Sequence, residues 1–309
     1  MQVLESIVDL AEIDGPVHLG IGVFDGVHLG HQAVIRSAID CAQRTGGTAV
    51  AVTFDPHPVK ILRPEIAPRL LTSTPHKVRL IAAMDMPFLL KVRFDAVFAS
   101  LAAEDFIARL VEHAQPLRTI SVGHDWAFGR GRTGNVAMLK SLGAKTNFSV
   151  VEVDPVLLDG DPVSSTRIRR AVQAGEFDIA SRCLGRRYSI LGTVERGQQL
   201  GRTIGFPTAN LRAHNEQFPP DGVYAVRTRI GLREVGGVAN VGMRPTVETH
   251  AAERRLEVHL FDVDEDLYHC DLEVVFEDFL RPEKKFGNLA ELQTQIGADA
   301  AVARKLLAR

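Results

Sequence analysis

The segment HLGIGVFDGVHLGHQAVIRSAIDCAQR, residues 18–44, encodes a strand, a turn and a helix in succession. HLGIGVF (18–24) has the apolar character of a buried strand. HQAVIRSAIDCAQR (31–44) is typical of a helix, because its apolar residues from Val34 to Ile39 share one helical face. Glycines separate the two patterns, so we expect a tight strand-to-helix turn between them.

The same alternation continues through the first half of the chain. Strands are predicted at 48–54, 87–92, 117–123 and 147–153, and helices at 76–84, 103–114 and 165–175. Strands and helices that alternate at these lengths predict a parallel α/β sheet with right-handed crossovers. Because ligands of such sheets bind at the carboxyl ends of the strands, we expect the functional residues of this half there.

The pattern changes after about residue 184. Strand-like segments such as YSILGTVER, GVYAVRTRI and RRLEVHLFDV follow one another with Gly- and Pro-containing joints between them. This succession of short strands and turns predicts an antiparallel barrel or sandwich. A last helix is expected after Asn288 as its N-cap, with an apolar stripe that runs from Leu289 through Leu292 to Ile296.

The composition fits two packed domains, which we place at residues 1–183 and 184–309. Hydrophobic residues make up 45% and charged residues 24%, which excludes an intrinsically disordered chain. The formal net charge is -2, so the basic excess typical of bulk nucleic-acid binding is missing. Scattered cysteines, no signal-peptide pattern and no apolar run of membrane-spanning length predict a reduced, cytoplasmic protein without nucleic-acid or membrane partners.

The turn GVFDGVHLGH (22–31) carries the strongest local signal for function. Its glycines let a phosphate approach the backbone, and the helix N-terminus that follows offers N–H groups to it. His28 and His31 are three residues apart, so both imidazoles can donate to phosphate oxygens from one side of the turn. A zinc-binding pair or two solvated histidines would show the same spacing, but the glycines and Asp25 favour phosphate.

These motifs together resemble one enzyme family over nearly the whole chain. HLGH is similar to the HxGH signature of the nucleotidyltransferase superfamily. TFDPHP (53–58), GHDWAFG (123–129) and VSSTRIR (163–169) resemble the FMN adenylyltransferase half of the bifunctional bacterial riboflavin kinase/FAD synthetases. GRTIGFPTANL (201–211) and LEVHLFD (256–262) resemble the riboflavin kinase half. The resemblance implies a Rossmann-like nucleotidyltransferase domain followed by a riboflavin kinase-like β-barrel with a terminal helix.

For the first domain the resemblance implies a site for ATP and FMN. His28 and His31 would hold the ATP phosphates, beside a turn formed by Gly22, Phe24, Asp25, Gly26 and Gly30. A second phosphate-binding signature, suited to a pyrophosphate leaving group, would be Ser164, Ser165, Thr166 and Arg169, although a capped helix with solvated arginines would look alike. The flavin side would be Asp55, His57, Pro58, Asp125 and Phe128. Trp126 and Pro162 depart from the family, which commonly has Phe and a basic residue there.

For the second domain the resemblance implies a kinase site. A glycine-rich loop with Gly192, Gly197, Gly201 and Gly205 would wrap the ATP phosphates, although a hairpin with turn glycines has the same composition. Thr208 and Asn210 offer hard oxygen ligands two residues apart and would hold Mg²⁺ with ATP. Glu257 would be the general base for the riboflavin hydroxyl, where a strand carboxylate is usually only solvated. Arg281 and Phe286 would belong to a flavin-binding loop.

Other functions remain as alternatives. GRGRTG (129–134) matches the glycine pattern of a dinucleotide fingerprint, but HDWAF separates it from the preceding strand, which disfavours an NAD enzyme. A flavin-binding regulator without turnover, another HxGH adenylyltransferase, or a tRNA-charging enzyme would share parts of the pattern. The expected substrates are ATP, riboflavin and FMN, with the protein a monomer or weak homo-oligomer.

Overall fold

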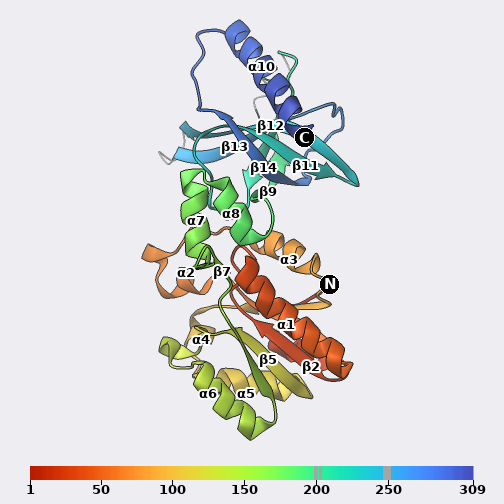
Figure 1. Ribbon diagram of the computed structural model, residues 1–309, viewed down its shortest axis with the longest axis vertical. Helices are drawn as coiled ribbons and strands as arrows, with labels where there is room; N and C mark the ends of the chain where they lie inside the picture. The colour runs from red at the N-terminus through yellow and green to blue at the C-terminus, as the bar shows by residue number, and fades with distance from the viewer. Residues whose placement is uncertain (198–200, 202–203, 246–251, 309) are drawn as a thin grey trace. The chain divides into compact units, whose positions relative to one another are not determined.

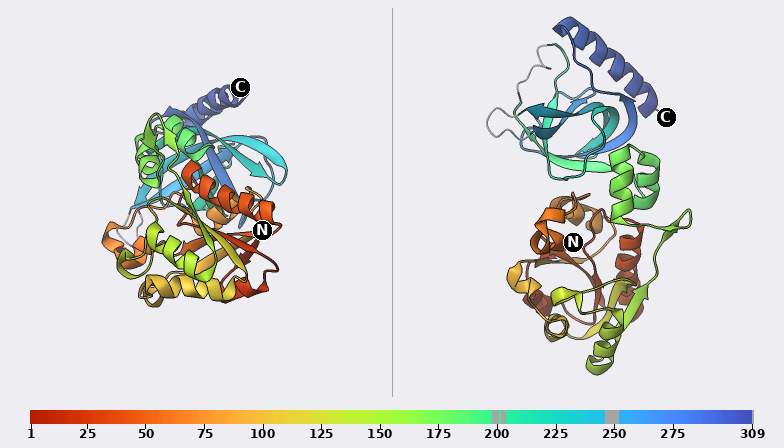
Figure 2. Two further views of the ribbon diagram at one scale, coloured as in Figure 1. Left: turned by 60° about the horizontal axis from the view of Figure 1, so that its bottom comes forward. Right: turned by 90° about the vertical axis from the view of Figure 1, so that its left-hand side faces the viewer.

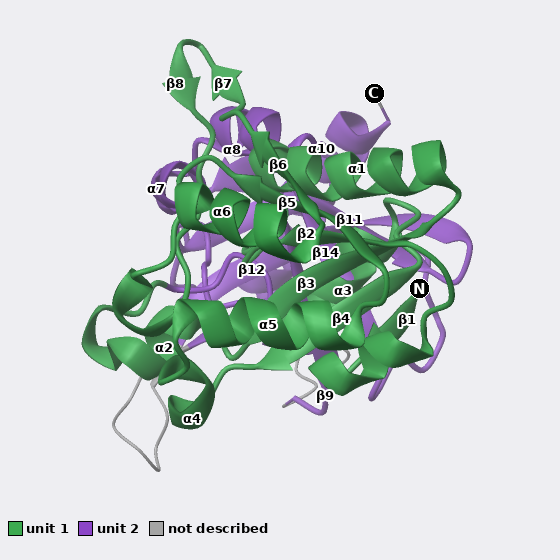
Figure 3. Ribbon diagram, turned by 90° about the horizontal axis from the view of Figure 1, so that it is seen from below, with its two compact units in different colours: residues 1–68, 74–165 green, residues 69–73, 166–309 purple. Residues whose placement is uncertain are grey.

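The computed structural model describes residues 1–197, 201, 204–245 and 252–308 (Figure 1). The chain divides into two compact units (Figure 3). Unit 1 comprises residues 1–68 and 74–165, and unit 2 comprises residues 69–73 and 166–309. Among the helices that the structure describes, none has the length and apolar character needed to cross a membrane.

Unit 1 is built on a parallel sheet with the strand order β1-β4-β3-β2-β5-β6. The strands are β1 (Gln2–Leu4), β2 (Val17–Ile21), β3 (Thr48–Asp55), β4 (Phe88–Arg93), β5 (Leu117–Gly123) and β6 (Ser149–Val153). From β2 the chain adds strands on one side and then returns to add β5 on the other. This switch of direction next to β2 opens the crevice in which ligands of open α/β sheets bind.

Helices cover both faces of this sheet. They are α1 (Leu29–Thr45), α2 (Pro58–Leu62), α3 (Thr74–Ala82), α4 (Ala96–Ala99), α5 (Ala103–His113) and α6 (Val136–Thr146), with 3₁₀ helices at Ile7–Glu12, Pro64–Ile66 and Arg130–Arg132. Alternation along β3 sends Val50 and Val52 into the core shared with α5 and α6, and Ala49 and Ala51 into the core shared with α1 and α3. A short hairpin, β7 (Leu157–Leu158) with β8 (Asp161–Pro162), follows β6.

Unit 2 contains a closed antiparallel barrel with the strand order β10-β13-β12-β11-β14-β9. The strands are β9 (Ser189–Glu195), β10 (Ala209–Ala213), β11 (Gly222–Ile230), β12 (Arg233–Pro245), β13 (Ala252–Leu260) and β14 (Asp271–Arg281). Helix α10 (Leu289–Leu307) lies along the barrel against β11, β12 and β14 (Figures 1 and 2). The predicted fold class, a parallel α/β domain followed by a barrel with a terminal helix, is confirmed.

Two parts of unit 2 come from sequence outside the barrel region. Helices α7 (Ser165–Ala174) and α8 (Phe177–Leu184) precede β9, and the Phe177 ring stacks on Phe276 of β14 with 5.8 Å between centroids. The segment 69–73 also joins this unit, because Asn215 donates from Nδ2 to the Leu71 carbonyl at 2.6 Å. The compact units therefore divide the chain at positions other than residue 183, and the limits of the independently folding domains stay a prediction.

Candidate active sites

The turn after β2 adopts an unusual backbone conformation. Phe24 has φ 54°, Gly26 has φ 85° and Val27 has φ 42°, so two side-chain-bearing residues lie in the left-handed region. The Phe24 ring is fully buried, and a side chain at Gly22 would collide with it. Strained turns of this kind persist where the surrounding packing enforces them, which is common at ligand sites.

His28 and His31 lie together at the start of α1. His28 is the N-cap, and its Nδ1 accepts from the His31 backbone N–H at 3.3 Å. A neutral imidazole that accepts at Nδ1 carries its proton on Nε2, which is then a donor. The His31 ring stacks on the His28 ring with 3.6 Å between centroids. The pair therefore offers hydrogen-bond donors to an anion at a helix N-terminus, where the helix dipole also favours negative charge.

The second phosphate-binding signature reaches this turn through Ser165. Its Oγ donates to the Asp25 carbonyl at 2.9 Å, although the two residues are 140 positions apart. Ser164 precedes it in the chain and also belongs to unit 1. Thr166 and Arg169 belong to unit 2, where Arg169 Nε donates to the Arg69 carbonyl at 2.8 Å. Their phosphate roles therefore stay predictions, while Ser165 stands beside the histidine turn.

The predicted flavin-side residues follow β3 and β5. Asp55 ends β3 and accepts from Thr74 Oγ1 at 2.7 Å, whereas His57 caps the short helix α2 that begins at Pro58. After β5, Asp125 is exposed and Phe128 is buried in the core. Trp126 stacks on Phe128 at 4.3 Å between centroids and is only half-buried, so Trp126 is the more accessible ring of the pair.

The glycine pattern at residues 129–134 does not follow a strand directly, as a dinucleotide fingerprint does, because β5 already ends at Gly123. The segment forms a turn in which Phe128 and Gly134 exchange backbone hydrogen bonds of 3.0 and 2.9 Å. Gly129 and Gly131, with φ 73° and 66°, supply the left-handed conformations that this turn needs. Its glycines are thus explained by local backbone geometry.

Lys77 on α3 was not predicted from the sequence. Its side chain is buried, and its Nζ donates to the Val23 carbonyl at 2.7 Å and to Thr53 Oγ1 at 3.2 Å. Burial lowers the pKa of Lys77 to about 8, while the charges of Asp25 and Asp55 oppose that shift. Nothing in the predicted helix 76–84, which also contains His76 and Arg79, marks Lys77 as buried.

In unit 2 the predicted kinase residues meet across three neighbouring strands. Asn210 of β10 and Asn240 of β12 both pair in register with Glu257 of β13. These three residues line one cavity of about 430 Å³, together with Thr208 and His259. Asn240 was missed from the sequence because nothing local marks which residues face each other across the barrel.

The glycine-rich loop packs directly against these groups. A side chain at Gly197 would collide with the Asn210 amide, and one at Gly201 would collide with the Phe206 carbonyl. Gly205 has φ 82°. Gly192 instead lies inside β9 opposite Ala213, so close packing between strands explains its small size. Residues 198–200 and 202–203 of the loop lie outside the described residues.

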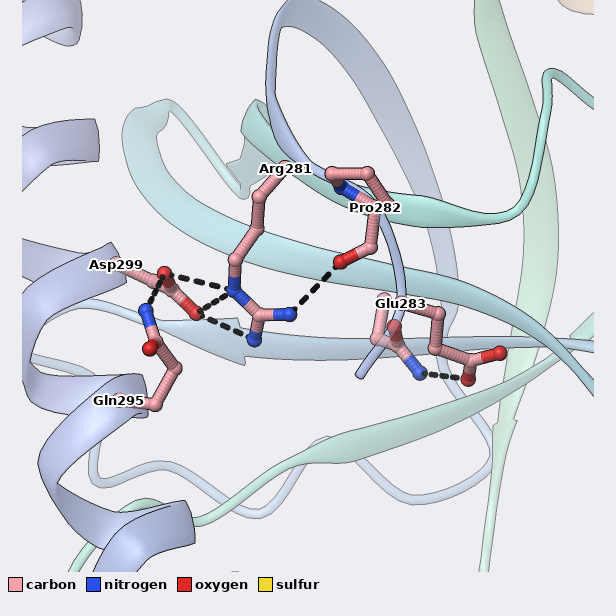
Figure 4. A network of polar contacts seen from close by, with 6 residues as sticks. Arg281, Pro282, Glu283, Gln295 and Asp299 are labelled. Atoms are coloured by element: carbon pink, nitrogen blue, oxygen red, sulfur yellow. Dashed lines mark hydrogen bonds and ion pairs between the residues drawn. The ribbon is translucent and has the colours of Figure 1, made fainter. Parts of the chain in front are cut away.

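Another part of the cavity wall contains an ion pair (Figure 4). Arg281 donates to Asp299 of α10 through Nε, at 3.0 Å to each carboxylate oxygen, and through Nη2 at 2.8 Å. Gln295 Nε2 donates to the same carboxylate at 2.9 Å. Arg281 pairs with Asp299, a residue that the sequence reasoning missed, and its expected contact with flavin stays a prediction.

Further lining residues come from α10 and from the segment that joins β14 to it. The Phe286 ring centroid lies 5.7 Å from the Arg281 guanidinium. Glu283, labelled in Figure 4, accepts from Asn240 Nδ2 at 3.3 Å. Leu292 and Ile296 line the cavity from α10, whereas Leu289, expected in the same apolar stripe, is 51% exposed. The cavity therefore combines an apolar wall with a row of polar groups, as a flavin and a nucleotide phosphate require.

The fold and these two sites define a nucleotidyltransferase domain joined to a kinase barrel, and comparison with known proteins agrees. Residues 11–167 match the FAD synthetase family model and residues 184–307 match the riboflavin kinase model. The chain is 37% identical over 288 residues to the bifunctional riboflavin kinase/FMN adenylyltransferase of Escherichia coli strain K12, covering 93% of this chain and 91% of that protein. The enzyme of the same name from Pseudomonas fluorescens is 39% identical over 297 residues, with 95% of each chain covered.

The chain belongs to the bifunctional riboflavin kinase/FMN adenylyltransferase family. It phosphorylates riboflavin to FMN with ATP and adenylylates FMN to FAD with release of pyrophosphate. A solved structure from Streptococcus pneumoniae, described as a macrolide-efflux protein, is 29% identical and has a TM-score of 0.81 over 98% of this chain and 99% of that one. That structure supports the fold, whereas the family matches carry the activity.

Proposed function

We propose that the two reactions are divided between the two sites, with FMN adenylylation at the histidine turn of unit 1 and riboflavin phosphorylation in the barrel of unit 2. The observation that carries the kinase assignment is the row of Asn210, Glu257 and Asn240 in one cavity. The corresponding observation in unit 1 is the stacked histidine pair at the start of α1.

In the kinase site the Glu257 carboxylate accepts the proton of the terminal hydroxyl of riboflavin as that oxygen attacks the γ-phosphorus of ATP. The bond from the γ-phosphorus to the bridging oxygen of the β-phosphate breaks, so ADP leaves. Gly197 and Gly201 keep the loop backbone close to Asn210 and Thr208, so main-chain N–H groups can approach the phosphates. The apolar wall with Leu292 and Ile296 accommodates the flavin ring. Arg281 serves by holding α10 against β14, which keeps this wall in place.

Mg²⁺ is the metal that the donor set fits. Thr208 and Asn210 present hard neutral oxygens in the cavity. Across the part of the chain that the structure describes, no group of three or more His, Cys, Asp and Glu side chains forms a complete metal cage. Because Mg²⁺ commonly takes few protein ligands and binds with nucleotide phosphates, we propose that it enters this site with ATP and offsets phosphate charge.

In the adenylylation site an FMN phosphate oxygen attacks the α-phosphorus of ATP and the bond to the β-phosphate oxygen breaks, so pyrophosphate leaves. His28, His31 and the N-terminus of α1 donate to the phosphates as negative charge moves onto the leaving group. Ser164, Ser165, Thr166 and Arg169 are proposed to hold the pyrophosphate. Asp55, His57, Pro58 and Asp125 are proposed to line the flavin side, with Trp126 and Phe128 as its aromatic pair.

The substrates that we propose are the small molecules ATP, riboflavin and FMN. An enzyme that draws on ATP twice is proposed to act in the cytoplasm. We propose a monomer or a weak homo-oligomer, which light scattering across a concentration series would measure.

Glu257→Gln tests the kinase assignment, because it preserves the shape of the side chain and removes the basic carboxylate. We expect FMN formation to slow by about 10²- to 10⁴-fold, with riboflavin affinity little changed. FAD formation from supplied FMN should continue. Glu234→Gln, which changes an exposed strand carboxylate that pairs with Arg227, is the matched control. A near-normal kcat for Glu257→Gln would remove Glu257 from the mechanism.

A further inference from the structure

Lys77 is a buried cation at the carboxyl ends of two adjacent strands in unit 1. Only 5% of the residue is exposed. Its Nζ joins the Val23 carbonyl, which follows β2, to Thr53 Oγ1 on β3, and Thr53 Oγ1 donates to the same carbonyl at 3.0 Å. A single ammonium group thus fixes the residue that directly precedes the strained turn.

The charges of two carboxylates act on this ammonium group. Asp25 of the turn is 3% exposed, and Asp55 ends β3. Both stabilise the charged form of Lys77, whereas burial disfavours it. Without the cation, the charges of Asp25, in the same turn as His28, and of Asp55, at the end of β3, would not be offset where a polyphosphate is proposed to bind. Repulsion of this kind is strong in a site that excludes water.

We infer that Lys77 is a positioning residue for FMN adenylylation, which sets the shape of the phosphate-binding turn through Val23 and offsets the charges of Asp25 and Asp55. This inference rests on the proposed assignment of adenylylation to the histidine turn. Lys77 donates to the protein backbone and to Thr53, so it acts through the turn and is not itself a catalytic residue. A neutral side chain of similar length would fill the space but would supply neither the donor nor the charge.

Lys77→Met and Lys77→Arg in the full chain test this role. For Lys77→Met we expect kcat/KM for ATP in FAD formation to fall about 100-fold, because the turn shifts and the carboxylates repel the nucleotide. Lys77→Arg should recover much of this loss, since it restores the charge and the donor. The riboflavin kinase rate of the same chain should stay near the wild-type value. Lys140→Met, which removes an exposed cation paired with Glu152, is the matched control and should leave both reactions unchanged.

The pH dependence of the adenylylation rate distinguishes two roles of Lys77: positioning of the turn through its charge, and structural support of the fold. Burial lowers the pKa of Lys77 to about 8, so raising the pH through this value removes the charge and should weaken wild-type adenylylation. Lys77→Met should lack this decline relative to the wild type. Both chains contain Asp25, Asp55, His28 and His31, so a decline that only the wild type shows depends on the side chain at position 77.

His28→Ala distinguishes failure of the inference from failure of the site assignment. If His28→Ala loses FAD formation while Lys77→Met keeps it, Lys77 is no positioning residue and the site stands. If both variants keep it, the site is misplaced. Equal loss of the kinase and adenylyltransferase rates in Lys77→Met, or the same pH decline in Lys77→Met as in the wild type, would also overturn the inference.

Discussion

The ion pair between Arg281 and Asp299 allows the kinase cavity to be perturbed without touching a reacting group. The Asp299 side chain is 7% exposed and the Arg281 side chain 20% exposed. Asp299→Ala leaves the guanidinium with its contact to the Pro282 carbonyl and removes the carboxylate. Breaking a buried pair from one side costs about 3–5 kcal/mol, and the partial exposure of Arg281 places the expected loss near the lower end, at about 3 kcal/mol.

The loss should appear in binding as well as in stability. Asp299 and Ile296 lie on the same helix, so a helix released from β14 also displaces the apolar wall. We expect the KM for riboflavin in FMN formation to rise and the urea midpoint of barrel unfolding to fall. FAD formation from supplied FMN should persist, because that reaction uses unit 1.

Asp262→Ala is a control at a second ion pair to the same helix, because Asp262 follows β13 and its partner Arg304 lies on α10. Asp262 also forms a two-point ion pair with an arginine of α10, Arg304, but its side chain is 78% exposed. Exposed pairs contribute little, so this variant should behave like the wild type. If Asp299→Ala matches Asp262→Ala in both the urea midpoint and the riboflavin KM, the wall does not depend on the buried pair, and the reasoning is refuted.

Three further outcomes are expected. Gly201→Ala should slow FMN formation at least about tenfold, because the new Cβ would meet the Phe206 backbone carbonyl. Kinase kinetics at saturating ATP would measure this rate, and a normal rate would show that the loop tolerates a side chain. Asn210→Ala should raise the Mg²⁺ concentration needed for half-maximal kinase activity, and excess Mg²⁺ should partly rescue it; Mg²⁺-independent loss would argue against a ligand role. A fragment of residues 184–309 should convert riboflavin to FMN and form no FAD. It should also unfold at a lower temperature than a fragment of residues 166–309, because it lacks the contact of Phe177 with the barrel. Equal melting temperatures would contradict this packing argument, and a folded but inactive 184–309 fragment would contradict the predicted domain limits.

Local sequence patterns were sufficient to predict the two-part fold and many of its elements, although helices α6 and α8 were not predicted. The alternation of apolar runs and helical faces in the first half reflects a sheet buried on both sides, a property visible within each segment. The turn at residues 22–31 and the segment GRTIGFPTANL (201–211) could also be recognised locally, because their glycines and polar residues are close together in the sequence. Helix α1 begins at Leu29, so the turn enters the helix two residues earlier than the periodicity indicated.

The missed residues depend on contacts between distant segments. In the sequence Lys77 is an ordinary lysine on an amphipathic helix, and only its contacts with Val23 and Thr53 show that it is buried. In the sequence Asp299 resembles a solvated acid, because its partner Arg281 lies close to it only in the folded barrel. Asn240 becomes part of the site only through the register of β12 with β13. Register and tertiary pairing are set by the whole fold, and a single sequence contains no local mark of them.

The central claim is that one chain holds two separate sites, and a mixing experiment tests it most directly. His28→Ala should convert riboflavin to FMN and stop there, whereas Glu257→Gln should convert FMN to FAD but not use riboflavin. Chromatography that resolves FMN from FAD would follow riboflavin and Mg²⁺–ATP incubated with each variant and with an equimolar mixture. We predict that neither variant alone makes appreciable FAD and that the mixture does, since FMN released by one chain serves the other. FAD formation from riboflavin by either folded variant alone, or a mixture that makes none although each variant performs its own half-reaction, would contradict the account.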